Sequence, residues 1–305
     1  MNDDLTNTGI AERPAEKETA SSSSSSLSPS SHAASRNGNE KRAVLERKPQ
    51  GPPKTIWREY FESAVVTVIM ALFGMTFIVQ AVKVPTGSMQ NTITIGDHLL
   101  VNKFIFAPGP PLPFLPQREI QRGDIIVFKY PGNSNQKLSE QIGDPENIPF
   151  KTNYVKRVIG LPGEHVEIRD DRVYINGKML PEHRITAVDH DDNPATIGRL
   201  ENNAPLEIRE NPPRAADEPY SVFYSINRSF DSDKKFDVPA DSYFVMGDNR
   251  NNSSDSRVWG YVKREYVVGR AMFVYWSYDE SAPSTNPLSS FFTNTRWNRT
   301  GTMVK

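Results

Sequence analysis

The stretch YVKRVIGLPGEHVEIRDDRVYING, Tyr154 to Gly177, decides the fold class. Its first part, YVKRVIGLPG, is a short run rich in β-branched residues that ends in a Pro-Gly turn, which is typical of a strand. The next part, Glu164 to Ile175, alternates between polar and apolar side chains, as a half-buried strand does. Asn176-Gly177 then provides a strong hairpin signal. The stretch therefore predicts a strand, a turn and a hairpin.

Similar strand signals occur on both sides of this stretch, and helical periodicity is nearly absent after residue 82. Between about 180 and 235 the chain is polar and rich in proline, which predicts an insertion of short strands and loops. The fold class is therefore mainly β. The other predicted strands are Thr94–Phe106, Arg122–Pro131, Asp241–Met246 and Val267–Tyr278.

A long apolar run, SAVVTVIMALFGMTFIVQAV, precedes the β-rich part. It extends from Ser63 to Val82, 20 residues without a charge. A helix of that length measures about 30 Å, the thickness of a bilayer core. A buried core helix is the alternative, but the run is apolar on all faces and has no caps. The run predicts one transmembrane helix.

Basic residues set the predicted orientation of this helix. Four lie shortly before it, and only Lys83 and Lys103 follow nearby. This bias places the N-terminus in the cytoplasm and residues 84–305 on the outer side. Residues 1–58 are rich in Ser and Pro, lack the apolar core of a signal peptide, and predict a disordered cytoplasmic tail. The four preceding basic residues are Arg47, Lys48, Lys54 and Arg58.

The composition excludes several classes of site. The net charge of −1 gives no basic excess for nucleic acid, and the absence of cysteine rules out disulfides, thiolate zinc sites and a cysteine nucleophile. In GDNRNNSSDSRVWG, Gly247 to Gly260, Arg250 falls where a calcium loop needs an oxygen ligand. We expect neither a metal nor a cofactor.

Ser88 is a candidate nucleophile because it lies in VPTGSMQNTITIGD, directly after the apolar run. A serine needs a base to remove its proton, and a Gly-Ser-Met turn on its own is more often structural. A histidine base has no local support, since each histidine is expected to be solvated. The histidines are His32, His98, His165, His183 and His190.

Lys156 is a candidate base. In a strand it shares one face with Tyr154 and Val158, while Arg157 lies on the other face. A cation on each apolar face predicts that at least one is enclosed, and full burial can lower the pKa of a lysine by ~3–5 units. A lysine at the strand edge with its ammonium in water is the alternative.

The segment Gly247 to Gly260 is the third chemical element. Its paired charges and two serines suit either a turn network that braces a neighbouring side chain or a long polar hairpin loop.

Four segments in one order after one membrane span resemble the bacterial signal peptidase I family, the membrane-bound Ser/Lys endopeptidases that remove signal peptides from exported proteins. They are PTGSM, RGDIIVFKYP, YVKRVIGLPGE and MGDNRNNSSDSRVWG. The resemblance covers most of residues 57–299, including RWNR at Arg296 to Arg299. It implies a β-rich catalytic core with a β insertion.

The resemblance also implies roles for individual residues. Ser88 matches the nucleophile and Lys156 the general base, while the backbone N–H of Ser88 and the hydroxyl of Thr86 match the oxyanion hole. Ser253 matches a serine that orients the lysine. The remaining matches are Asp255, Arg257 and Asp248 in a supporting charge network.

The implied substrates are secretory preproteins cut after small-x-small motifs at the outer face of the bacterial inner membrane, where the chain also meets lipid. We expect shallow apolar pockets for the small side chains. Their predicted lining is Val84, Pro85, Met89, Ile93 and Tyr154.

The chain departs from the family pattern in three places. Thr86 stands where serine is common, and Asn91 stands where the pattern Met-x-Pro-Thr-Leu has proline; many relatives also have two spans. The alternative function is a membrane-anchored β-rich module that binds envelope components without catalysis. A Ser/Lys self-cleaving regulator is a second alternative, although the tail contains no helix-turn-helix.

Overall fold

The computed structural model describes residues 55–110, 117–133, 148–188, 205–226, 233–283 and 286–305. The predicted tail, residues 1–58, lies outside the described residues except at its end. Residues 56–58 belong to a helix there.

The apolar run forms helix α1, Ile56–Phe73, which continues into the π-helical segment η1, Gly74–Ile78. The two together have 23 residues, include an 18-residue window with a mean hydropathy of 2.0, and have no buried side chain. At 1.5 Å per residue they measure about 34 Å, enough to cross a bilayer. The helix thus begins before the predicted Ser63, because Trp57, Tyr60 and Phe61 extend the apolar surface.

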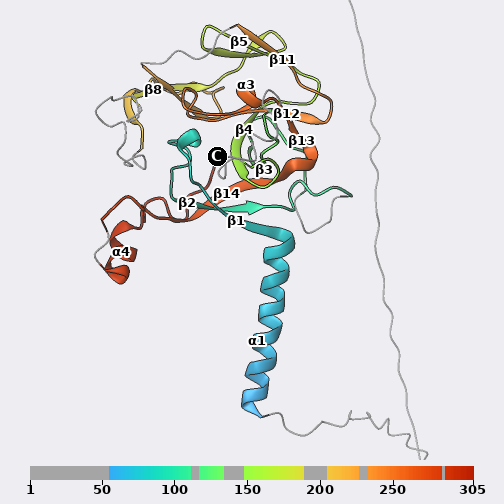
Figure 1. The fold of residues 1–305 in the computed structure, drawn as a ribbon, viewed down its shortest axis with the longest axis vertical. Coiled ribbons are helices and arrows are strands. Elements are labelled where there is room, and N and C mark those ends of the chain that lie inside the picture. Colours follow the sequence, from blue (N-terminus) through green and yellow to red (C-terminus); the bar gives the residue numbers. More distant parts are fainter. Residues whose placement is uncertain (1–54, 111–116, 134–147, 189–204, 227–232, 284–285) are drawn as a thin grey trace, which may run out of the picture. The chain divides into compact units, whose positions relative to one another are not determined.

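The last residues of the predicted span are not helical. Val79–Lys83 form strand β1, which pairs antiparallel with β2, Asp97–Asn102. A Val-rich apolar run suits either a helix or a strand, and here β2 offers hydrogen-bond partners. Lys103 holds the junction: its backbone N–H donates to Ile78 O at 2.9 Å and its Nζ to Thr76 O at 2.7 Å. Figure 1 shows α1 leading into β1 without a separate linker.

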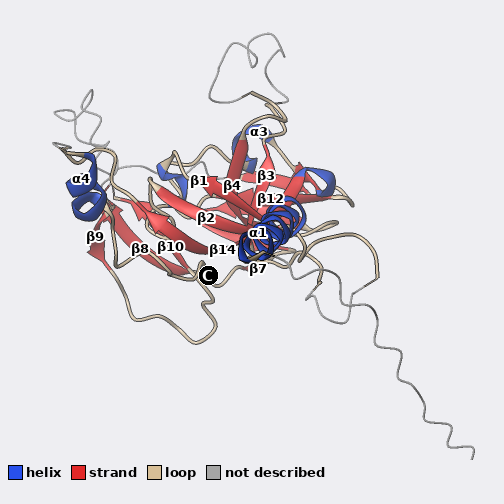
Figure 2. Ribbon diagram, turned by 90° about the horizontal axis from the view of Figure 1, so that it is seen from below, coloured by secondary structure: helices blue, strands red, loops and turns tan. Residues whose placement is uncertain are grey.

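The main sheet has seven strands in the order β1-β2-β14-β3-β4-β12-β13. All its neighbours are antiparallel, and the long strand β14 pairs with both β2 and β3. The fold is mainly β, as predicted, and strands gather in the body of the molecule (Figure 2). The bounds are β3 Ile125–Lys129, β4 Asn153–Gly160, β12 Ser242–Met246, β13 Val262–Lys263 and β14 Val267–Ser277.

The alternating run after β4 is two strands rather than one. A turn at Asp170 and Asp171, with φ angles of 50° and 57°, divides the run. Val166 and Ile168 are buried before the turn, Val173 and Ile175 after it, so the alternation changes phase there. These strands belong to a four-stranded sheet ordered β11-β5-β6-β7. Its bounds are β5 His165–Arg169, β6 Arg172–Ile175, β7 Lys178–Met179 and β11 Lys234–Asp237.

Short strands also occur in the predicted insertion. β8, His183–Val188, lies between β9, Glu207–Glu210, and β10, Ser221–Ser225, and the β8–β10 pair is parallel. Residues 189–204 and 227–232 lie outside the described residues. The limits of about 180 and 235 stay a prediction.

The structure has short helical elements that the sequence reading did not predict. Within the described ranges, the longest after the membrane span is α4, Pro287–Asn294. Asn286 caps it by accepting from Leu288 N at 3.0 Å, and Pro287 occupies the first turn, where proline is favourable. The others are η2 Gly87–Met89, α3 Ser256–Trp259 and η4 Arg264–Tyr266.

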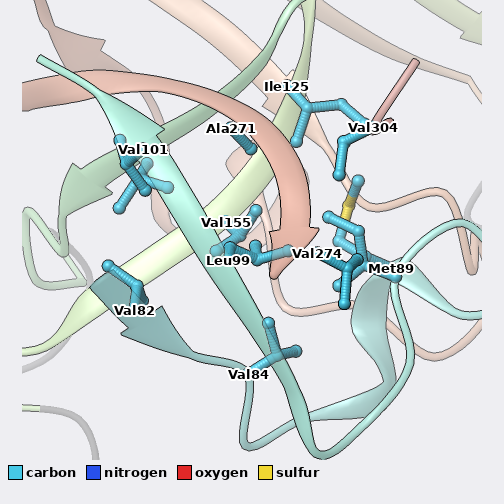
Figure 3. Close-up of a cluster of buried hydrophobic side chains, with 12 residues drawn as sticks. Val82, Val84, Met89, Leu99, Val101, Ile125, Val155, Ala271, Val274 and Val304 are labelled. Atoms are coloured by element: carbon cyan, nitrogen blue, oxygen red, sulfur yellow. The ribbon is translucent and has the colours of Figure 1, made fainter. Parts of the chain in front are cut away.

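A buried apolar cluster lies beneath the Gly-Ser-Met turn. Met89 is 1% exposed and belongs to the same cluster as Val84 and Leu99. Figure 3 shows Met89 near Val274 and Val304. Burial of Met89 anchors the turn that carries Ser88 to the main sheet, because exposing a methionine side chain would lose about 1.5–3 kcal/mol.

Candidate active site

Ser88 and Lys156 are in direct contact. Ser88 lies in η2, and Lys156 lies on β4 opposite Ile126 of β3. Lys156 Nζ is 2.6 Å from Ser88 Oγ. The turn and the strand are far apart in sequence, so the fold brings the two predicted chemical groups together.

Lys156 is enclosed without a paired carboxylate. Its exposed fraction is 3%, and among the described residues it makes no ion pair within 4 Å. Burial lowers the pKa of Lys156 from 10.5 to about 8; Arg257 also lowers it, whereas Asp255 and Asp248 oppose the shift. A lysine with that pKa is neutral in a substantial fraction of molecules near neutral pH. The alternative of a solvated edge lysine is wrong.

The neighbouring cation, Arg157, is also buried but is fully paired. Its Nε and Nη2 donate to the two carboxylate oxygens of Asp248 at 2.8 and 2.7 Å. Thr92, four residues after Ser88, donates its hydroxyl to the same carboxylate at 2.6 Å. Asp248 therefore connects the face of β4 opposite Lys156 to the loop that follows the serine turn.

Asp255 and Arg257 form a second buried pair. Arg257 Nε and Nη2 each donate to Asp255 at 2.7 Å, and Gly247 N donates to Asp255 Oδ2 at 3.0 Å. Burial opposes ionisation of Asp255, but Arg257 and these hydrogen bonds outweigh it and hold the pKa of the carboxyl below its ordinary value. The pair fixes the loop between β12 and α3.

Ser253 lies in the same loop. Its hydroxyl contributes to the lowered pKa of Asp255, yet its oxygen is buried and makes no hydrogen bond of ordinary geometry with any described residue. Its predicted role in orienting Lys156 stays a prediction.

Gly247 lies directly against the serine turn. A Cβ at Gly247 would collide with Ser88 O and with the side chain of Ser253. The next contact is made by Asn249, whose N donates to Ser88 O at 3.1 Å and whose Nδ2 donates to Gly87 O at 3.3 Å. Only glycine at 247 allows both segments to lie this close.

A groove of about 510 Å³ opens over Ser88 and Lys156. Thr86, Val84 and Pro85 line it, as do Met89 and Tyr154, so most of the predicted lining residues are there. Ile93 is not among them: it has no exposed surface and packs in the cluster beneath. The groove also has polar lining residues that were not predicted to line it, and two of them belong to the polar segment 247–260. These residues are Thr152, Asn153, Asn252 and Ser254.

The family model described as "Signal peptidase, peptidase S26" matches residues 57–276 of this chain. The chain belongs to the signal peptidase family. A signal peptidase I from Pseudomonas aeruginosa is 32% identical over 267 residues, covering 80% of each chain. A probable signal peptidase I-2 from Synechocystis is 32% identical over 230 residues, covering 75% of this chain and 78% of the relative. The resemblance found in the sequence is confirmed.

Among solved structures, a signal peptidase I from Enterococcus faecalis is 31% identical and covers 50% of this chain and 97% of that chain. The TM-score of 0.26 is too low to compare architectures.

Family membership and the apolar helix α1 fit a membrane-anchored hydrolase. Among the described residues, no group of three His, Asp or Glu side chains is arranged to hold a metal ion.

Two of the described histidines, His165 and His183, bond to groups other than Ser88, and His98 stacks against Trp276. His165 contacts Asp237, and His183 contacts Ser221 Oγ at 2.9 Å and Pro212 O at 2.8 Å. His183 is 6% exposed, so the expectation that it is solvated is wrong. Its partners come from the insertion, which the local sequence could not reveal.

Proposed function

We propose that this chain is a membrane-bound serine endopeptidase that removes signal peptides from exported preproteins, with Ser88 as nucleophile and Lys156 as general base. The observation that carries the proposal is the 2.6 Å contact between Ser88 Oγ and Lys156 Nζ, made by a buried lysine that has no carboxylate partner in the part of the chain that the structure describes. Family membership supplies the reaction class.

Proton transfer from Ser88 to Lys156 starts the reaction. With a pKa of about 8, roughly a tenth of Lys156 is neutral at pH 7. A lysine of ordinary pKa would be neutral in only about 0.04% of molecules. The serine oxygen attacks the scissile carbonyl, and Lys156 then returns the proton to the leaving amine. In the second half, Lys156 activates the water that hydrolyses the acyl-enzyme.

The tetrahedral intermediate carries a negative oxygen that needs donors. We assign this role to the backbone N–H of Ser88 and the hydroxyl of Thr86. Both residues line the groove, and Thr86 is exposed at its surface. Loss of one such donor typically costs about 3–4 kcal/mol in the transition state.

The groove selects the substrate by size. Val84, Pro85 and Tyr154 form apolar walls beside Ser88, and we assign to them, with Met89, the small side chains before the cut. The preprotein segment lies extended along the chain near Val84 to Met89, as a strand added to an edge. Lys156 and the loops around it are held in position by four supporting residues, namely Ser253, Asp255, Arg257 and Asp248.

We place the enzyme in the bacterial inner membrane with a single span, its N-terminus in the cytoplasm and residues 84–305 outside. Arg58 and the basic residues before it support this orientation. The apolar segment of the substrate and α1 then share one bilayer, which concentrates the two partners in two dimensions.

The test is processing of a preprotein with an Ala-x-Ala site by the full chain in liposomes. Wild type should cut after the second Ala, and Ser88→Ala and Lys156→Ala should not. Ser289→Ala on α4 and Lys235→Ala, whose side chain is 65% exposed, are the matched controls and should cut normally.

Unchanged processing by Ser88→Ala would contradict the proposal. Wild type that binds preprotein or envelope material but never cuts it would favour the non-catalytic binding module. Circular dichroism of each variant shows whether it has folded.

A further inference from the structure

Asn91 links the serine turn to the insertion. Its Nδ2 donates to Leu206 O at 3.2 Å, and its Oδ1 accepts from Leu206 N at 2.8 Å. A side-chain amide carries one donor group and one acceptor on the same plane, as a peptide unit does. The reciprocal pair therefore reproduces a contact that a neighbouring strand would make.

Leu206 is itself firmly packed. It is 6% exposed and belongs to a separate buried cluster with Ile185 and Ala187 of β8 and Phe223 of β10. Asn91 is thus bonded to the packed sheet of the insertion.

The insertion also reaches the serine turn from a second side. Phe223 N donates to Asp248 O at 2.8 Å, and Arg250 N donates to Phe223 O at 2.9 Å. The residue between these two, Asn249, bonds to Ser88 O and Gly87 O. The cluster around Leu206 and Phe223 is therefore tied to the segment 87–91 at both ends.

We propose that Asn91 is a positioning residue through which the insertion sets the placement of Ser88 against Lys156. The inference rests on the proposed function, because it assigns a role in that reaction. Small errors in the position of an attacking atom lower the rate sharply, whereas substrate binding in the groove depends on other residues. Loss of the Asn91 amide should accordingly reduce kcat while leaving KM nearly unchanged.

The position is also where the chain departs from the family's proline. A proline restrains its own φ and offers no side-chain hydrogen bond. Asn91 has no such local restraint, and its contact with Leu206 supplies one from the insertion.

The first experiment compares Asn91→Ala with Asn102→Ala in the full chain in liposomes. Asn102 is the matched control, because its part-buried side chain also bonds two backbone groups, Phe104 N at 2.9 Å and Ile105 N at 3.0 Å. We expect kcat for the preprotein to fall about tenfold in Asn91→Ala with KM within twofold, and both constants to stay near wild type in Asn102→Ala.

A double-substitution series tests the path. Leu206→Ala, which loosens the cluster, should lower kcat when Asn91 is present and should lower it by less in the Asn91→Ala background, where only the link through Phe223 and Asn249 remains. Independent effects of the two substitutions would contradict coupling through this contact.

The second measurement needs no activity. Hydrogen–deuterium exchange of a peptide covering residues 86–94 should be faster in Asn91→Ala than in wild type or Asn102→Ala. Wild-type exchange there, or a kcat equal to that of Asn102→Ala, would overturn the proposal. Failure of the proposed function looks different, since wild type and Ser88→Ala would then process preprotein alike, and the exchange measurement would still decide the role of Asn91.

Discussion

Two adjacent basic residues on β4 are both buried, but only one of them has a carboxylate partner among the described residues. Lys156 and Arg157 are 3% and 1% exposed, on opposite faces of one strand. Arg157 meets the carboxylate of Asp248 in a two-point contact and stays charged; burial alone would lower the pKa of Arg157, but Asp248 raises it. Lys156 has a serine hydroxyl as its neighbour and a lowered pKa.

The comparison separates a paired cation, Arg157, from Lys156, the proposed base. A buried charge that is paired acts as a fixed brace, and removal of one partner is strongly destabilising. A buried lysine without a paired carboxylate is unstable as a cation and becomes available as a base. Both side chains are buried, so the neighbouring group determines whether the cation stays charged or can act as a base.

The largest expected effect comes from making the two cations alike. Lys156→Arg retains a long cationic side chain but places at the site a group that cannot lose its proton. We expect kcat/KM for a preprotein to fall by about 10³-fold, within the range for loss of a general base. Quantitative processing assays at pH 8 measure it. Activity within tenfold of wild type would show that Lys156 does not act as the base.

The second effect is on stability, from Arg157→Met. This variant leaves Asp248 buried and unpaired, so we expect the free energy of unfolding to fall by about 3–5 kcal/mol. Thermal unfolding in detergent, with matched protein concentrations, measures it. The double variant Arg157→Met/Asp248→Leu should recover much of the loss. A single variant as stable as wild type would remove the contrast between the two cations.

Replacement of the cation on the other face of β4, Lys156→Met, should change the free energy of unfolding in the opposite direction. A lysine whose folded pKa is about 8 against 10.5 unfolded destabilises the folded state fully below pH 8, and this effect disappears as pH rises from 8 to 10.5. Lys156→Met should therefore raise the free energy of unfolding at pH 7 by about 3 kcal/mol. The gain should vanish near pH 10.5.

Lys151→Met is the control for that experiment, because Lys151 is exposed on the turn before β4. It should show no pH-dependent gain. A loss of stability in Lys156→Met that is the same at all pH values would contradict the assignment of a destabilised ammonium.

The smallest effect is the pH dependence of wild-type catalysis. The base must be neutral, so kcat/KM should rise with pH and reach half its plateau near pH 8. Between pH 7 and pH 9 the rise should be roughly tenfold. Processing rates across this range measure it, with a pH-independent control of preprotein binding. A plateau that is already complete at pH 6 would require a base other than a lysine with this pKa.

The sequence predicted the strands and the apolar helix because these depend on local pattern. Ser88 and Lys156 were only candidates by local pattern, and their predicted roles came from the resemblance of four segments to the signal peptidase I family. The alternation around Lys156 was enough to expect an enclosed cation. The alternation could not show whether Lys156 or Arg157 would form an ion pair. The partner, Asp248, is far along the chain and comes close to β4 because β12 pairs with that strand.

Other differences have local causes that were visible but ambiguous. The change of phase between Ile168 and Val173 marks the turn at Asp170 and Asp171. Asn286 and Pro287 carry the cap and the first residue of α4. In contrast, nothing near Asn91 or Ile93 indicates that one bonds to Leu206 and the other is buried in the cluster beneath, since both depend on tertiary packing.

Because the helical span passes directly into β1, the distance between the membrane surface and the groove is limited by a short length of chain. Helical structure ends at Ile78, and the groove begins at Lys83, five residues later on a strand that rises about 3.3 Å per residue. The groove entrance is then held at most about 17 Å along the chain from the end of the span. A substrate that is held in the same bilayer by its apolar segment can bring a peptide bond to Ser88 only if an extended segment of similar length separates that bond from the apolar segment. The length of chain between α1 and the groove therefore determines how far from the membrane the substrate is cut.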